Sequence, residues 1–197
     1  MSTGWRITVR EETLKAKVCL VGEAAVGKTS LIRRYVLDQF EDKYITTLGA
    51  KVSKKEMNFQ IPESNMDINL VMIIWDIMGE KSFRELTKEA FFHGTKAILA
   101  VCDLTRYNTL RELDDWIEAV FGVVGEVPVI YAVNKVDLKD EVMIMYGDSE
   151  LDQSTRAFNA EYFYTSAKTG ENVHLTFEWL GKNILRNQLS PEREPSR

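Results

Sequence analysis

Hydrophobic residues along this chain form two patterns. In one they follow each other in continuous runs, and in the other single hydrophobic residues recur every three or four positions. The continuous runs, such as ILAVCD and VIYAVN, are apolar on both faces, which is typical of strands covered by helices on both sides. This pattern predicts six strands: Ala16–Val21, Lys51–Gln60, Asn69–Asp76, Ala97–Asp103, Val127–Asn134 and Tyr162–Thr165.

Helical spacing marks the segments between most of these strands. In the last segment, Val173, Phe177, Leu180 and Ile184 fall on one face, so this face and the nearby Trp179 are expected to pack on the sheet. Five helices are predicted in all: Lys28–Leu37, Ser82–Phe92, Leu110–Val124, Ser149–Ala160 and Val173–Arg186.

The order of the elements predicts the fold. Only PESNMD separates the second and third strands, which leaves no room for a helix and predicts one antiparallel hairpin. The fold class is therefore α/β, a doubly wound, mostly parallel six-stranded sheet that binds ligands at the carboxyl ends of its strands. We expect one domain over residues 14–187, with a disordered tail at 188–197. Residues 1–13 would form either an extra strand or a flexible extension.

Composition narrows the class of protein. The 197 residues carry a net charge of −5, so no nucleic-acid partner is expected. Cys19 and Cys102 lie in apolar runs and are expected to be buried thiols in a reducing compartment. The sequence shows no signal peptide, no run of about 20 apolar residues and no C-terminal cysteine, which predicts a cytoplasmic protein without a direct lipid anchor.

The apolar stretch Val142–Gly147 would pack under the next helix or form a docking patch.

A phosphate-binding loop follows the first strand. The segment GEAAVGKTS fits G-x-x-x-x-G-K-[ST] between a strand and a helix, the context that this motif requires. Its glycines let backbone N–H groups turn toward phosphate oxygens, and the helix dipole adds to the attraction. Lys28 would reach the β- and γ-phosphates, and the Thr29 hydroxyl would bind Mg²⁺. The predicted loop residues are Gly22, Glu23, Ala24, Ala25, Val26, Gly27, Lys28, Thr29 and Ser30.

Two further motifs suggest which base is bound. The fifth strand ends in NKVD and the sixth in TSAK. The Asp137 carboxylate would accept two hydrogen bonds from guanine, from N1–H and the exocyclic amine, and adenine offers no such pair. A site built on such bonds discriminates strongly, because the wrong base leaves a polar group unpaired.

With these motifs in order, the chain resembles the Ras superfamily of small GTPases, especially its Rab-like members, over about Lys15–Arg186. The resemblance implies that Phe40 packs on the base, Tyr44 covers the phosphates and Thr47 is the switch threonine. Asn134 would support the loop and contact the base, Lys135 would lie across the face of the base, and Ala167 would offer its N–H to guanine O6. The base-binding residues would be Asn134, Lys135, Asp137, Ser166, Ala167 and Lys168.

The segment WDIMGE would complete the phosphate end of the site. Asp76 suits the acid that orients Mg²⁺, together with the hydroxyls of Thr29 and Thr47. Gly79 would bring its N–H to the γ-phosphate without a clashing Cβ. Contacts to that phosphate are lost on hydrolysis, which would make Asp38–Gly49 and the segment after Gly79 switches.

Glu80 departs from the family pattern, which has glutamine at this position. An ionised Glu only accepts hydrogen bonds, and its charge disfavours close approach to a triphosphate. Met78 could also crowd the γ-phosphate. We take the catalytic group to be Glu80, Gly79, Thr47 and Lys28.

Two functions remain open from these residues. The first is a Mg²⁺-dependent GTP/GDP switch with slow hydrolysis, and the second is a nucleotide-bound interaction or scaffold module with negligible turnover. A phosphotransferase lacks support, because no arginine-rich lid follows the P-loop helix. An effector, exchange factor or activating protein would bind at Asp38–Gly49 and Glu80–Phe92.

Overall fold

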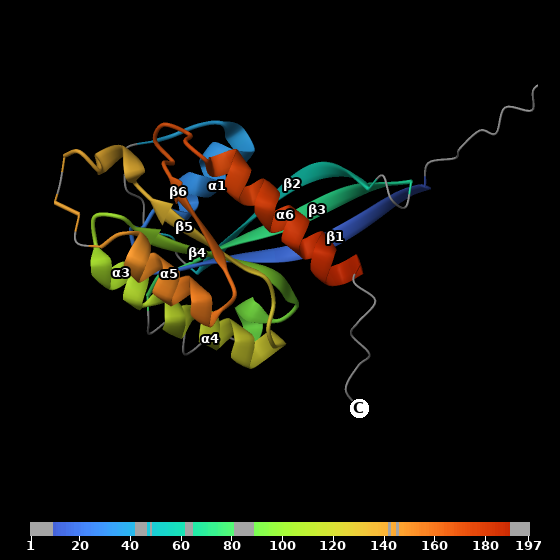
Figure 1. Ribbon diagram of the computed structural model, residues 1–197. Coiled ribbons are helices and arrows are strands. Elements are labelled where there is room, and N and C mark those ends of the chain that lie inside the picture. The colour runs from blue at the N-terminus through green and yellow to red at the C-terminus, as the bar shows by residue number, and fades with distance from the viewer. Residues whose placement is uncertain are drawn as a thin grey trace, which may run out of the picture.

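The structure, a computed structural model, describes residues 10–41, 47, 49–61, 65–80, 89–141, 143–144 and 146–189 of the protein. These residues form one six-stranded sheet with helices on both faces, as predicted (Figure 1). The strands are β1 (Arg10–Val21), β2 (Ala50–Ile61), β3 (Met66–Ile77), β4 (Thr95–Asp103), β5 (Val129–Asn134) and β6 (Glu161–Thr165).

The sheet has the strand order β2-β3-β1-β4-β5-β6. Strands β2 and β3 pair antiparallel from Ala50↔Ile77 to Ile61↔Met66, and every other neighbouring pair is parallel. The predicted hairpin and the predicted doubly wound sheet are therefore confirmed. The carboxyl ends of the five parallel strands meet at one edge, where such sheets bind ligands.

The helices are α1 (Lys28–Leu37), α3 (Tyr107–Arg111), α4 (Leu113–Val124), α5 (Asp148–Ala157) and α6 (Val173–Leu189). A single 3₁₀ turn, η2, covers Val136–Leu138. Of the helix predicted at Ser82–Phe92, residues 89–92 are helical and residues 81–88 lie outside the described part of the chain. None of the helices described is both long and apolar enough to cross a membrane.

The helix predicted at Leu110–Val124 is two helices. The chain turns helical at Tyr107, and the break comes at Glu112, whose N–H donates to both Asn108 O and Leu110 O. Such shared bonds are common at helix ends, where the last turn tightens. The polar start of α3 shows no apolar spacing, so the sequence pattern missed it. Helix α4 ends at Gly125, which has φ 75°, a left-handed value that glycine adopts at low cost.

Strand β1 begins earlier than predicted. Arg10 pairs with Met66, so residues 10–13 of the predicted extension continue β1 beside β3 rather than form a separate strand. Residues 11–15 alternate between more and less exposed positions, and the sequence pattern of a fully buried strand begins only at Ala16. Residues 1–9 lie outside the described part of the chain.

Each face of the sheet is covered by its own apolar core. On one face, α1 and α6 pack on the sheet and on each other, with the rings of Tyr35 and Phe177 stacked at 3.9 Å. On the other face lie α3, α4 and α5 (Figure 1). Trp116 of α4 is fully buried there. Cys19 and Cys102 are buried free thiols, as predicted.

The apolar loop before α5 packs inward through its last aromatic residue. Tyr146 is 5% exposed and its hydroxyl donates to Asp103 O at 3.0 Å. Its ring also contacts Tyr107 of α3, with ring centroids 5.4 Å apart. Met143 is 84% exposed, and residues 142 and 145 lie outside the described residues. The packing interpretation therefore holds for Tyr146.

Candidate functional site

The phosphate loop between β1 and α1 depends on two glycines with left-handed backbones. Gly22 has φ 132° and Gly27 has φ 102°. A Cβ on Gly22 would lie 2.2 Å from Val101 O, and one on Gly27 would lie 2.2 Å from Asn134 Nδ2. Both neighbours are held in place, one on β4 and the other at the end of β5. The loop can therefore take this course only with glycine at both positions.

Lys28 begins α1 and points back into the loop. Its ammonium group donates to Gly22 O at 2.7 Å and to Glu23 O at 2.9 Å, and the residue is 6% exposed. Burial lowers the pKa of Lys28 to about 8, although the charges of Asp76 and Glu23 oppose this shift. A buried cation whose hydrogen bonds to described residues go to two neutral carbonyls strongly attracts an anion at this point.

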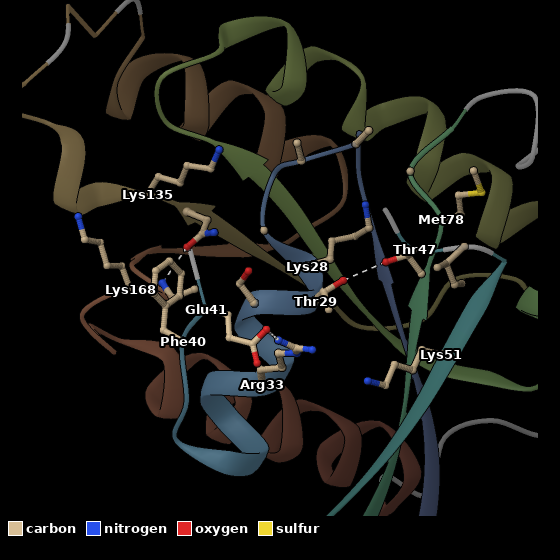
Figure 2. Close-up of a pocket in the computed structure, with 18 of the residues that line it drawn as sticks. Lys28, Thr29, Arg33, Phe40, Glu41, Thr47, Lys51, Met78, Lys135 and Lys168 are labelled. Carbon is tan, nitrogen blue, oxygen red and sulfur yellow. Dashed lines mark hydrogen bonds and ion pairs between the residues drawn. The ribbon is translucent and has the colours of Figure 1, made fainter. Parts of the chain in front are cut away.

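Three side chains form a cluster beside the loop. Thr29 Oγ1 lies 3.0 Å from Thr47 Oγ1 (Figure 2). Thr29 Oγ1 also donates to Asp76 Oδ2 at 2.5 Å. Asp76 is 2% exposed, and its other carboxylate oxygen, Oδ1, has no hydrogen-bond partner among the described residues. Burial raises the pKa of Asp76. A hard cation such as Mg²⁺ takes oxygen ligands of this kind, so the cluster fits a magnesium ion.

Gly79 lies directly against the phosphate loop. A Cβ at this position would come within 2.5 Å of Glu23 C and 2.6 Å of Ala24 N, so only a glycine allows the two backbones to approach so closely. The preceding residue is held in place, because Met78 N–H donates to Gly49 O at 2.9 Å. Met78 and the exposed Glu80 both line the same cavity as the loop.

The base-reading motifs meet at the ends of β5 and β6. Asp137 Oδ1 accepts a hydrogen bond from Ser166 Oγ at 2.5 Å, which fixes the direction of the carboxylate. Asn134 Nδ2 donates to Val26 O at 2.9 Å, and Asn134 Oδ1 accepts from Ala167 N–H at 3.1 Å. Asn134 therefore links the phosphate loop to the base loop, which follows β6 and comprises residues 166–168. The Ala167 N–H expected to meet guanine O6 is bonded to Asn134 in this structure.

Lys135 has a partner that the sequence analysis missed. Its ammonium lies 2.6 Å from Oδ2 of Asp103, a carboxylate 1% exposed at the end of β4. Arg106 also donates to Asp103 Oδ2, at 2.9 Å, and its Nη2 donates to Ala24 O at 3.1 Å. Burial alone would raise the pKa of Asp103, but hydrogen bonds from Lys135, Thr105 and Arg106 outweigh it and lower this pKa. The sequence feature that could have identified Asp103 is the one that identified Asp76, namely an acidic residue at the end of a buried strand.

These parts enclose one cavity of about 580 Å³. Figure 2 shows Lys28, Thr29 and Thr47 at one end and Lys135, Lys168 and Phe40 at the other. The predicted site residues that line it are Ala24, Ala25, Gly27, Lys28, Thr29, Ser30, Phe40, Thr47, Gly79, Glu80, Asn134, Lys135, Asp137, Ala167 and Lys168. Met78, expected to crowd the γ-phosphate, lines it as well, and the lining residues that were not predicted are Arg33, Glu41, Lys51, Ile77 and Leu138.

The other predicted site residues lie around this cavity or outside the description. Gly22, Val26 and Ser166 support its walls through the contacts given above. The Glu23 side chain turns away and accepts a hydrogen bond from Trp116 Nε1 at 3.3 Å. Asp76 lines a neighbouring cavity, together with Thr29 and Lys51. Tyr44 lies outside the described residues.

Comparisons with known proteins agree with this arrangement. A sequence model of the Ras family matches residues 17–186. The chain is 33% identical to the Ras-related protein Rab7 of Drosophila melanogaster over 181 residues, 89% of this chain and 83% of the relative. It is 30% identical to the Ras-related protein Rab-21 of Bos taurus, over 92% of this chain and 78% of the relative. Rab-21 of Geodia cydonium is 31% identical, over 89% of this chain and 73% of the relative.

Sheet order, phosphate loop, base loop and these similarities lead to one assignment. The match covers every strand beyond the first part of β1 and both ends of the cavity. The chain therefore belongs to the Ras family and is a small, Rab-like GTPase.

Proposed function

We propose that this GTPase is a Mg²⁺-dependent switch that hydrolyses GTP slowly on its own. The observation that best supports this proposal is the phosphate end of the cavity. There the anion-binding parts, the loop and Lys28, are complete, while Glu80 stands where the family has glutamine. Nucleotide binding and the difference between the GTP-bound and GDP-bound states would then be retained, and GTP hydrolysis would be slower.

The proposed nucleotide would lie along the cavity with its phosphates on the loop. Lys28 would exchange its two carbonyl partners for phosphate oxygens, which gives its buried charge a full counter-charge. At the other end Asp137, already aimed by Ser166, would accept two hydrogen bonds from guanine. Phe40 and Lys135 would cover the faces of the base.

The magnesium ion would be held by Thr29, Thr47 and Asp76. These residues offer two hydroxyls 3.0 Å apart and a carboxylate oxygen that has no hydrogen-bond partner in the described part of the chain. When bound, the ion would neutralise charge on the β- and γ-phosphates. Thr47 belongs to the segment Asp38–Gly49, so a contact that depends on the γ-phosphate would order this segment only in the GTP state.

Hydrolysis requires a water oxygen to attack the γ-phosphorus while the bond from that phosphorus to the bridging oxygen breaks. GDP leaves with the bridging oxygen, and the proton of the water passes to phosphate or to a nearby base. The carboxylate of Glu80 can accept a hydrogen bond from this water but cannot donate one toward the phosphoryl oxygens. Its negative charge also opposes approach to the triphosphate. Both effects would slow the reaction.

Single-turnover GTP hydrolysis by the purified protein tests this proposal. We expect slow hydrolysis by the unchanged chain and an increase of about tenfold or more in Glu80→Gln, because the amide restores a donor. GDP affinity should change little, and GTP affinity should not fall, because the substitution removes a negative charge at the phosphate end of the cavity. An unchanged or lower rate in Glu80→Gln would contradict this role for Glu80.

A second candidate is a nucleotide-bound interaction module with negligible hydrolysis. The same charged Glu80 in the cavity favours it, because a strong enough repulsion would stop turnover. Bound GTP that persists for hours in the purified protein, with or without cell extract, would favour this candidate over the slow switch.

The proposed partner surface comprises the segments Asp38–Gly49 and Glu80–Phe92, where an effector, exchange factor or activating protein would read the nucleotide state. Within it, residues 42–46, 48 and 81–88 lie outside the described part of the chain.

The proposed nucleotide-binding domain comprises residues 14–187, with 1–13 and 188–197 as flanking segments. The regular elements described extend slightly beyond these bounds, from Arg10 to Leu189.

A further inference from the structure

Arg34 joins α1 to the loop that follows β6. Its Nε donates to Ala167 O at 2.9 Å and its Nη2 donates to Lys168 O at 2.7 Å. These carbonyls are more than 130 positions away in the sequence. The Arg34 side chain is 16% exposed, and the backbone of Gly170 lies beside its stem, so the guanidinium is held in this direction.

The remaining nitrogen of the same guanidinium binds the end of α1. Arg34 Nη1 donates to Asp38 Oδ1 at 3.0 Å and to Asp38 O at 3.3 Å. Asp38 in turn has φ 53° and donates its N–H to Arg34 O, which ends the helix. Asp38 is also the first residue of the segment proposed as the first switch. One guanidinium therefore contacts both the base loop and the start of that segment.

The base loop is held from two sides. On the inside, Asn134 accepts from Ala167 N–H. On the outside, Arg34 donates to the carbonyls of Ala167 and Lys168. Both of these loop residues line the cavity beside Asp137. Arg34 makes these contacts with three different nitrogens, Nε, Nη1 and Nη2, so its planar guanidinium spans acceptors that a lysine would have to reach from one nitrogen.

We propose that Arg34 is a positioning residue for guanine recognition, which sets the Ala167–Lys168 backbone against the edge of the base and couples it to Asp38 at the start of the first switch. This inference rests on the proposed function. It assigns the recognition of the purine oxygen at position 6 to the Ala167 N–H, which would turn from Asn134 Oδ1 to that oxygen while Arg34 holds the carbonyl of the same residue, whereas Asp137 would read positions 1 and 2. A partner that pulls the first switch outward would weaken the Arg34 contacts and loosen the base.

The test measures the release of GDP, 6-thio-GDP and IDP from the full chain during a chase with excess unlabelled nucleotide. 6-Thio-GDP carries a poorer acceptor at position 6, and IDP lacks the 2-amino group. Arg34→Ala should speed GDP release about tenfold, the effect of losing two charge-assisted hydrogen bonds that are partly replaced by water. It should reduce the preference for GDP over 6-thio-GDP and leave the preference for GDP over IDP unchanged.

Two further variants keep the test interpretable. Arg34→Lys keeps the charge and can make one of the two carbonyl contacts, so its release rate should lie between those of the unchanged chain and Arg34→Ala. Lys182→Ala removes an exposed cation of α6 that pairs with Glu178 and does not line the cavity, and it should release GDP at the unchanged rate.

The outcomes separate this inference from the proposed function. If the unchanged chain holds none of the three nucleotides, the proposed function fails. If it holds GDP and Arg34→Ala releases GDP at the same rate, Arg34 has no positioning role. Faster release of all three nucleotides by the same factor would also overturn the inference, because it indicates a general loosening of the fold.

Discussion

The ammonium group of Lys135 lies 2.6 Å from the buried carboxylate of Asp103. The same carboxylate binds Arg106, which donates to the phosphate loop at Ala24 O. A single acid at the end of β4 thus connects the loop for the phosphates with the lysine expected to cover the base. Removing its charge should disturb both ends of the cavity.

Asp103→Asn tests this connection. The amide cannot neutralise Lys135 and Arg106, so two cations lose their shared partner near a buried position. We expect the free energy of unfolding to fall by about 2–3 kcal/mol, less than for a fully buried pair because both cations are partly exposed. Urea unfolding measures the loss. The matched change Glu178→Gln, in the exposed pair with Lys182, should cost less than about 1 kcal/mol, and an equal cost in both variants would contradict this role of Asp103.

Asp137→Asn tests how the base is read. The side-chain amide presents a donor where the carboxylate accepted two hydrogen bonds, so preference should move from guanine toward xanthine nucleotides. We expect GDP affinity to fall on the order of 10²-fold, measured by calorimetry on nucleotide-free protein. Asp140→Asn changes an exposed acid in the same loop that does not line the cavity, and it should bind GDP normally. An unchanged preference for guanine in Asp137→Asn would remove Asp137 from base recognition.

Gly79→Ala tests the close approach of the segment after β3 to the phosphate loop. The added Cβ would lie 2.5 Å from a backbone atom of Glu23, so one of the two backbones must shift. Because the contact is at the phosphate end, GTP affinity should fall about tenfold more than GDP affinity. Equilibrium titration with both nucleotides gives the ratio.

Gly122→Ala serves as the control for that substitution. Gly122 lies in α4, and nothing lies within 4 Å of the Cβ that alanine would add. Nucleotide affinity should stay the same, and stability should rise slightly because alanine favours the helix. A fall in GTP affinity in the control equal to that in Gly79→Ala would show that the effect is unspecific.

The lowered pKa of Lys28 predicts a pH dependence of binding. In the nucleotide-free protein this pKa is about 8, and phosphate binding favours the protonated form, so the bound state holds the proton to higher pH. Affinity for GDP should therefore be constant below pH 8 and fall by up to about tenfold per pH unit above it. Calorimetry between pH 6.5 and 9 measures this, with Lys28→Arg as the variant whose charge persists. The same decline in Lys28→Arg would show that another group is responsible.

The sequence predicted the sheet and both ends of the cavity for a physical reason. Strands such as β4 and β5 are buried on both faces, so they read as continuous apolar runs, and the motifs follow them directly. Gly22 and Gly27 have backbone angles and close contacts that only glycine tolerates. Both are fixed positions of a short sequence motif, so the loop could be recognised from the sequence.

The contacts of Arg34, Asp103 and Arg106 could not be predicted in the same way. Each includes a contact between segments that are distant in the sequence, and three of the Arg34 contacts go to backbone carbonyls, which any residue type supplies. The start of α3 and the first residues of β1 were missed because their polar sequences show no apolar period.

The strand order has a consequence for what the cavity can hold. The phosphate loop follows β1, and the base-reading motifs follow β5 and β6, which are two and three places along the sheet. Adjacent strands lie about 4.8 Å apart, so the two ends of the cavity are held roughly 10–14 Å from each other. The hydrogen-bonded strands therefore fix the distance between the phosphate end and the base end of the cavity, and with it the length of the ligand. Substitutions in the loops can change the affinity for a mononucleotide but not this distance.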